Sequence, residues 1–183
     1  MSDIDILDQM IKDSAKQPLS KHQNKMNVEL AEPKQPMSST IIYGVPENAV
    51  VIKVDTFPSP DAVFNGSQGE CRRADYVIVS NANGKKVIVY IEMKATKGSL
   101  PEIIQQLKGA QCFIAYCREV GKSFWQEQDF LKGYRQRFIS IGHTSIPKRK
   151  TRIMRQTGKH DRPEKMLKID WPHYVQFNML AGA

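Results

Sequence analysis

Two apolar runs separated by Asn-Gly at residues 83–84 are the clearest structural feature of the chain. Residues 76–79 read Tyr-Val-Ile-Val, and residues 87–91 read Val-Ile-Val-Tyr-Ile. Asn-Gly between β-branched runs favours a two-residue type I′ turn, because both central residues of that turn need positive φ. The pattern therefore predicts a β-hairpin in which Ala82 pairs with Lys85.

The register of this hairpin places three charged residues on one face of a sheet. Counting back from the turn sets Val77 opposite Tyr90 and Asp75 opposite Glu92, and opposed residues share a face. Lys94 follows Glu92 by two positions, so it projects from the same face. Opposed carboxylates repel, which favours a cation between them, and Mg²⁺ takes oxygen ligands. With a lysine to position or activate water, these side chains suit metal-assisted phosphodiester hydrolysis.

The first 40 residues are expected to lie outside the main domain. Residues 2–14 have an amphipathic helix pattern that begins with a capping box at Ser2. Residues 15–40 are rich in Lys, Gln, Ser and Pro, which predicts a linker or arm with one short helix around residues 28–30. The main domain is therefore placed at residues 41–183.

The remaining apolar pattern completes an α/β domain. Further strands are predicted at residues 41–43, 49–54, 137–141 and 166–169, and helices after Ser99 and over residues 123–132. The helix after Ser99 carries an apolar stripe at Ile103, Leu107, Ala110 and Ile114. Packed on the hairpin, this stripe predicts a mixed central sheet flanked by helices.

The motif at these positions resembles the PD-(D/E)xK nuclease superfamily, whose members share the restriction-endonuclease-like fold. The match consists of Asp75 at the head of one strand, Glu92-Met93-Lys94 at the end of the next, and a glutamine-bearing helix. Ala74 stands where the proline of the family motif would be. The resemblance implies that Asp75 and Glu92 bind Mg²⁺ or Mn²⁺ together with the Met93 carbonyl, and that Lys94 positions or activates the attacking water.

The resemblance also implies a supporting glutamine and a further upstream acid. Gln106, which borders the apolar stripe, would support the metal site or contact the phosphate; Gln105 and Gln111 are weaker substitutes, and a surface role is the alternative. Glu70 is the nearest candidate for the upstream acid. Its alternative interpretation is a solvated ion pair with the neighbouring arginines.

Composition favours a polyanionic partner. The 183 residues carry a formal net charge of +8, and basic residues are concentrated over residues 148–168, which we expect to form a loop. The expected phosphate-binding residues are Arg72, Arg73, Lys148, Arg149, Lys150, Arg152 and Arg155. Charge alone does not choose between nucleic acid and an anionic membrane. No apolar run approaches the roughly 20 residues of a membrane span, and the expected partner is nucleic acid and not a membrane. The acidic N-terminus and three cysteines without a CxxC pattern suggest the cytoplasm.

The sequence therefore favours a metal-dependent nuclease, with DNA expected as substrate in preference to RNA. Repair, recombination, phage and defence roles stay open, as does a homodimer. One alternative is a catalytically inactive nuclease-fold module that binds nucleic acid. Another is a subunit of a larger assembly that docks through the N-terminal arm.

Overall fold

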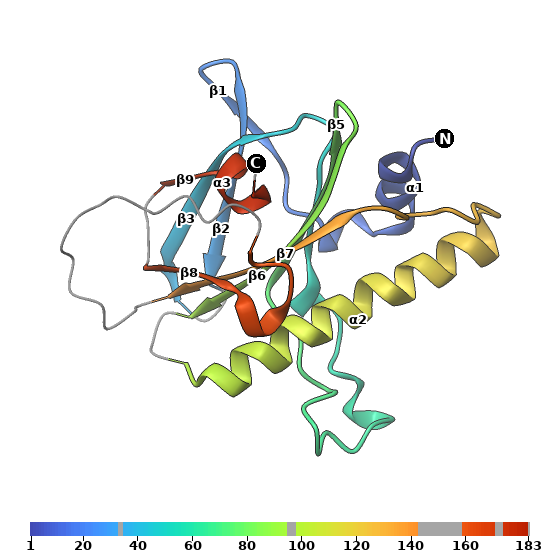
Figure 1. Cartoon of the computed structure of the whole chain (residues 1–183), viewed down its shortest axis with the longest axis vertical. Coiled ribbons are helices and arrows are strands. Elements are labelled where there is room, and N and C mark those ends of the chain that lie inside the picture. The colour runs from blue at the N-terminus through green and yellow to red at the C-terminus, as the bar shows by residue number, and fades with distance from the viewer. Residues whose placement is uncertain (33–34, 95–97, 143–158, 171–173, 183) are drawn as a thin grey trace.

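The chain forms a mixed α/β structure with two mixed sheets and three α-helices among the described residues (Figure 1). The computed structural model describes residues 1–32, 35–94, 98–142, 159–170 and 174–182. The larger sheet has the order β4 (Val50–Lys53), β5 (Tyr76–Ala82), β6 (Lys85–Lys94), β7 (Arg135–Gly142) and β8 (Leu167–Asp170). The smaller sheet has the order β1 (Ser20–His22), β2 (Lys25–Glu32), β3 (Gln35–Val45) and β9 (Tyr174–Gln176). The helices are α1 (Asp3–Met10), α2 (Leu100–Phe124) and α3 (Phe177–Ala181), and short 3₁₀ turns lie at Asp13–Ala15, Val54–Thr56, Pro60–Ala62 and Pro163–Lys165.

The predicted hairpin is confirmed as the pair β5–β6. Ala82 pairs with Lys85 and Val77 with Tyr90, in the register set by a two-residue turn. Asn83 and Gly84 have φ values of 51° and 76°, as the type I′ turn requires.

Side-chain alternation along this hairpin separates two apolar cores. Val77, Val79, Ile88 and Tyr90 pack with residues of α1 and α2. The intervening residues of β5 and β6 pack instead against the smaller sheet and α3. The larger sheet is thus the middle of three layers, because both of its faces are covered.

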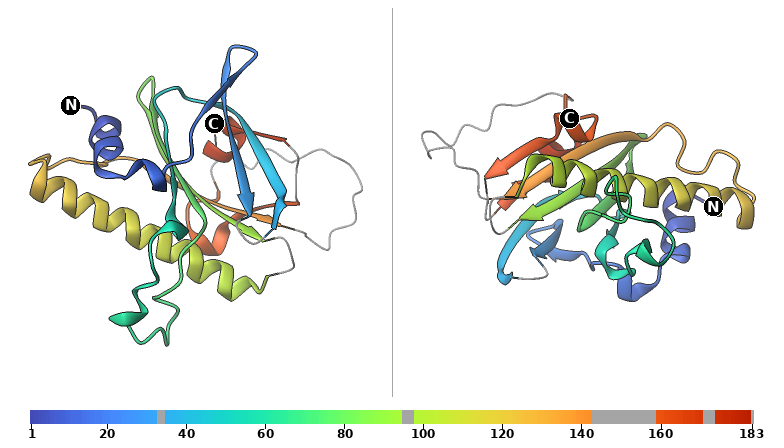
Figure 2. Two further views of the ribbon diagram at one scale, coloured as in Figure 1. Left: turned by 180° about the vertical axis from the view of Figure 1, so that it is seen from behind. Right: turned by 90° about the horizontal axis from the view of Figure 1, so that it is seen from below.

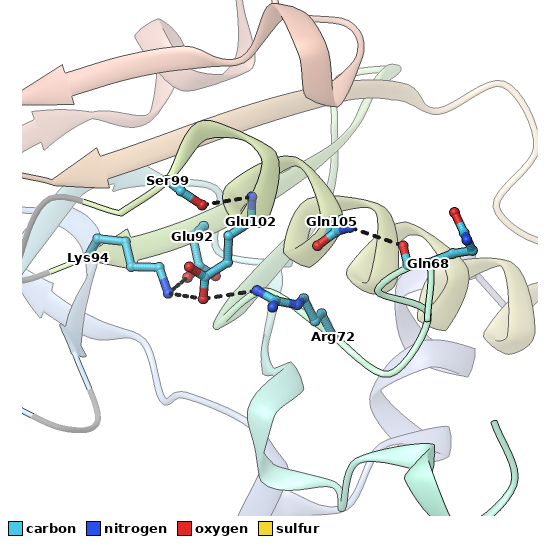
Figure 3. Close-up of polar contacts among 7 residues, drawn as sticks. All are labelled: Gln68, Arg72, Glu92, Lys94, Ser99, Glu102 and Gln105. Carbon is cyan, nitrogen blue, oxygen red and sulfur yellow. Dashed lines mark hydrogen bonds and ion pairs between the residues drawn. The ribbon is translucent and has the colours of Figure 1, made fainter. Parts of the chain in front are cut away.

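Helix α2 connects β6 to the parallel strand β7 and crosses one face of the larger sheet (Figures 1 and 2). Its predicted apolar stripe is confirmed: Ile103, Leu107, Ala110 and Ile114 are all buried. The helix begins beyond the carboxyl end of β6, so its first turn lies beside Glu92 and Lys94 (Figure 3). No helix in the described part of the chain is long and apolar enough to cross a bilayer.

The linker expected over residues 15–40 is wrong. These residues contribute β1, β2 and the first half of β3, and the expected boundary at residue 40 falls inside β3. The short helix around residues 28–30 is also wrong, since Val28 and Leu30 are fully buried and Glu29 between them is exposed. That period of two belongs to a strand with one covered face.

The helix expected over residues 123–132 is wrong as well. Helix α2 instead continues to Phe124 and ends at Trp125, and turns follow up to β7. Phe130 is buried as expected, but Phe124 is 79% exposed. The other expected strands are confirmed, and α1 has the expected capping box at Ser2, although it ends at Met10.

His160 ties the C-terminal helix to the larger sheet. Its main-chain carbonyl accepts a hydrogen bond from the Phe138 amide, and its Nε2 lies 2.8 Å from the Leu180 carbonyl oxygen. The ring must therefore donate from Nε2. It is fully buried, and its Nδ1 has no hydrogen-bond partner among the described residues. Burial lowers the pKa of His160, and the charge of Arg137 lowers it further.

We predict that this buried imidazole makes folding sensitive to acid. The unfolded chain takes up a proton near pH 6.5, whereas the folded ring takes it up at a lower pH, so stability present above pH 6.5 is lost as the pH falls. Between pH 7.5 and 5.5 the wild type should therefore lose stability through His160. Urea denaturation of the wild type and of His160→Gln across this range measures it. The variant should show a flatter pH dependence, and equal slopes would contradict the prediction.

Candidate active site

Three elements bring charged side chains together at one end of the larger sheet. Asp75 precedes β5, Glu92 and Lys94 end β6, and Glu102 lies in the first turn of α2. Figure 3 shows Lys94, Glu92 and Glu102 facing one another, with Arg72 reaching Glu102 from the segment before β5. The structure therefore gathers the predicted Asp75, Glu92 and Lys94 in one place.

Glu92 is a buried carboxylate that has Lys94 as a close countercharge. It is 1% exposed, and Lys94 Nζ lies 3.0 Å from its Oε1 as an ion pair. Among the described residues, no group meets hydrogen-bond geometry with either of its oxygens. Burial holds the pKa of Glu92 well above its ordinary range, and the charge of Asp75 raises it further. These surroundings are not those of a surface glutamate, and a buried carboxyl group with a strongly raised pKa is a candidate functional residue.

Asp75 is held against the end of β6. Its Oδ2 accepts a hydrogen bond of 2.7 Å from the Met93 amide, and its main-chain carbonyl accepts one from Val54. The side chain is half-buried. These contacts place the Asp75 charge near Glu92 and fix the main chain of Met93 beside both acids.

Lys94 is held as a cation by its acidic neighbours. Burial alone would lower the pKa of Lys94, but the carboxylate of Glu92 outweighs that effect, and the pKa is raised. Its side chain is 23% exposed, and Nζ also lies 3.8 Å from Glu102 Oε1. In this arrangement Lys94 is protonated.

Glu102 is a site residue that the sequence interpretation did not include. The Ser99 hydroxyl accepts a hydrogen bond from the Glu102 amide at 3.3 Å, as in a helix N-cap. The Glu102 side chain points away from Ser99, and its Oε1 lies 3.0 Å from Arg72 Nη1. The available signal was a glutamate three residues after a capping serine, directly downstream of the Glu-Met-Lys strand.

The glutamines of α2 differ in what they contact. Gln106 lies one turn after Glu102, and its buried Oε1 accepts no hydrogen bond from the described residues. Gln105 Nε2 donates to the Gln68 carbonyl at 3.1 Å, and Gln111 Nε2 donates to Gln136 Oε1 at 2.6 Å. Gln106 is therefore distinguished by a buried amide oxygen that no described residue binds, whereas Gln105 and Gln111 use their Nε2 groups in contacts with other parts of the chain.

Glu70 and Arg73 stabilise the segment before β5. The carboxylate oxygens of Glu70 accept hydrogen bonds from the amides of Gly66 and Gln68. The Arg73 guanidinium donates to the carbonyls of residues 54, 55 and 57 and lies over the Phe57 ring. These contacts hold the chain that carries Arg72 and Asp75. Lys148, Arg149, Lys150, Arg152 and Arg155 lie outside the described residues.

A magnesium-like cation that keeps most of its water would need only one or two protein carboxylates at this site. No three His, Cys, Asp or Glu side chains form a ligand group in the described part of the chain. Two carboxylates are what a typical Mg²⁺ site takes from the protein, the other ligands being water and substrate phosphate. The buried Glu92 Oε2, without a hydrogen-bond donor among the described residues, is an oxygen ligand of the required kind.

We predict that Glu92 lowers the stability of the metal-free protein and is needed for Mg²⁺ binding. Glu92→Gln removes a buried charge, so in EDTA the variant should melt at or above the wild-type temperature. Mg²⁺ at about ten times its Kd for the wild type should raise the Tm of the wild type by about 3–6 °C. The same concentration should leave the Tm of Glu92→Gln unchanged. Differential scanning calorimetry at pH 8 tests both statements. Glu164→Gln is the control, because Glu164 is an exposed acid paired with Lys108. An equal Mg²⁺ response in all three proteins would count against the site.

Comparisons with known proteins do not place the chain in a family. No family model matches it, and neither the curated proteins nor the solved structures contain a significant match.

Proposed function

We propose that the protein is a metal-dependent nuclease of the PD-(D/E)xK type with a restriction-endonuclease-like core, acting on DNA in preference to RNA. The observation that carries this proposal is the buried Glu92 carboxylate, which lies beside Asp75 and the Lys94 ammonium group. Burying a charged carboxylate costs several kcal/mol, and one partly exposed lysine offsets only part of that cost. A cation-binding role explains why such a residue stands at the end of a central strand.

Each side chain has a role that follows from its position. Asp75 and Glu92 would hold Mg²⁺ or Mn²⁺, which would supply positive charge to the phosphate group as it is attacked. Charge on Glu92 is what raises the pKa of Lys94, so neutralising Glu92 would lower that pKa. Lys94 would then lose its proton to solvent more readily, and as a free amine it could take a proton from the attacking water.

Two further residues would act around this centre. Gln106, one turn beyond Glu102 on α2, would orient water or phosphate through its amide. Arg72, with its side chain 45% exposed, would contact the phosphate backbone of the substrate.

One observation favours the second candidate function, a non-catalytic module that binds nucleic acid. Lys94 Nζ already lies 3.0 Å from Glu92, so the lysine can itself neutralise that carboxylate. A protein of this kind would bind nucleic acid without needing a divalent metal.

A cleavage assay separates the two candidates. Labelled DNA and RNA, single- and double-stranded, are incubated with the protein and Mg²⁺ or Mn²⁺. We expect DNA cleavage that EDTA abolishes and that falls about a hundredfold or more in Glu92→Gln and in Lys94→Met. Lys108→Met is the matched control, because Lys108 lies on α2 and forms its ion pair with the exposed Glu164 rather than with a residue of the site.

The outcomes are distinct for each candidate. Cleavage by wild type and Lys108→Met, lost in the two site variants, supports the nuclease. Binding by all four proteins with cleavage by none supports the module instead. Cleavage that survives in Glu92→Gln would overturn the assignment of the site.

A further inference from the structure

We propose that Arg72 and Lys94 form a subsite for one phosphate group of the substrate, and that the Glu102 carboxylate occupies this subsite until nucleic acid displaces it. The inference rests on the proposed function and deepens it, because it assigns a phosphate-binding pair and an internal competitor. In this proposal Glu102 is a counter-ion that leaves when phosphate binds, and it is not a metal ligand.

The contacts of a single carboxylate oxygen support the subsite. Glu102 Oε1 lies 3.0 Å from Arg72 Nη1 and 3.8 Å from Lys94 Nζ (Figure 3). Two cations that converge on one anionic oxygen are arranged as they would be around a phosphate oxygen. Arginine also suits this exchange because its guanidinium fork matches phosphate and carboxylate equally well.

The position of Arg72 is fixed by its main chain, which leaves the side chain free to change partner. A Cβ at Gly109 would overlap the Arg72 carbonyl oxygen, so glycine allows this segment to lie directly on α2. The Arg72 amide donates to the Gly69 carbonyl at 3.0 Å, and Gln105 holds the neighbouring Gln68 carbonyl. The guanidinium is therefore presented beside the site whether or not Glu102 engages it.

Exposure makes the exchange possible. The side chains of Arg72 and Glu102 are 45% and 40% exposed, so neither is sealed into the core. A pair this open contributes little to stability. Lys94 keeps Glu92 as a second partner when Glu102 leaves. The protein thus loses little stability when a phosphate takes the place of Glu102.

The test is whether removing the Glu102 charge strengthens or weakens DNA binding. If Glu102 competes with phosphate, Glu102→Gln should bind a short fluorescein-labelled DNA duplex about three- to tenfold more tightly than wild type. The DNA affinity of Glu102→Gln should also fall more steeply with salt concentration than that of the wild type, by the amount expected for about one additional phosphate contact. Fluorescence anisotropy in EDTA measures both without cleavage. If Glu102 were a structural partner or a metal ligand, the same change would leave binding unaltered or weaken it.

Matched variants exclude a general charge effect. Glu164→Gln makes the same change in net charge and breaks the Glu164–Lys108 ion pair of 2.7 Å, so it should alter binding less than twofold. Adding Arg72→Ala to Glu102→Gln should abolish the gain. Equal binding by the two glutamine variants, or no binding by any of the proteins, overturns the subsite.

Activity data keep this inference separate from the proposed nuclease. In the presence of Mg²⁺, Glu102→Gln should lower KM, whereas loss of a metal ligand would lower kcat. Tighter binding without cleavage by the wild type would reject the nuclease and keep the subsite. Cleavage by the wild type without tighter binding by Glu102→Gln would reject the subsite and keep the nuclease.

Discussion

The buried charge of Glu92 is the constraint around which this end of the molecule is arranged. An ionised carboxylate removed from water needs a countercharge, and Lys94 lies 3.0 Å away while Asp75 adds a second negative charge nearby. Such an arrangement contributes little to folding, because a neutral side chain in the same place would avoid the cost of burial. Its value lies in what it can bind, and this is why we relate it to a cation and a phosphodiester.

The fold delivers these groups through rigid elements. The hairpin turn at Asn83 and Gly84 sets the register of β5 and β6, and that register brings Asp75 to the carboxyl end of β6. The crossover through α2 then places Glu102 beside the same strand end. Glu92, Lys94 and Glu102 are therefore positioned by a strand end and by a long helix, and Arg72 by a turn that lies directly on that helix.

Sequence reasoning was reliable where the pattern was local. The hairpin register follows from a two-residue turn, and the α2 stripe follows from a helical period, so Asp75, Glu92 and Lys94 could be brought together in advance. Residues 15–40 could not be recognised, because β2 alternates buried Val28 and Leu30 with polar residues in a segment of linker-like composition. Glu102 was missed because its contacts with Arg72 and Lys94 depend on tertiary structure.

If Asp75 and Glu92 jointly bind a divalent cation, anomalous diffraction from crystals soaked in Mn²⁺ should locate it. We expect a single strong peak about 2.1 Å from a carboxylate oxygen of each residue. With that peak, a bound metal ion should join Lys94 beside Glu92. No peak between the two carboxylates at saturating Mn²⁺, with Lys94 still paired to Glu92, would contradict the claim.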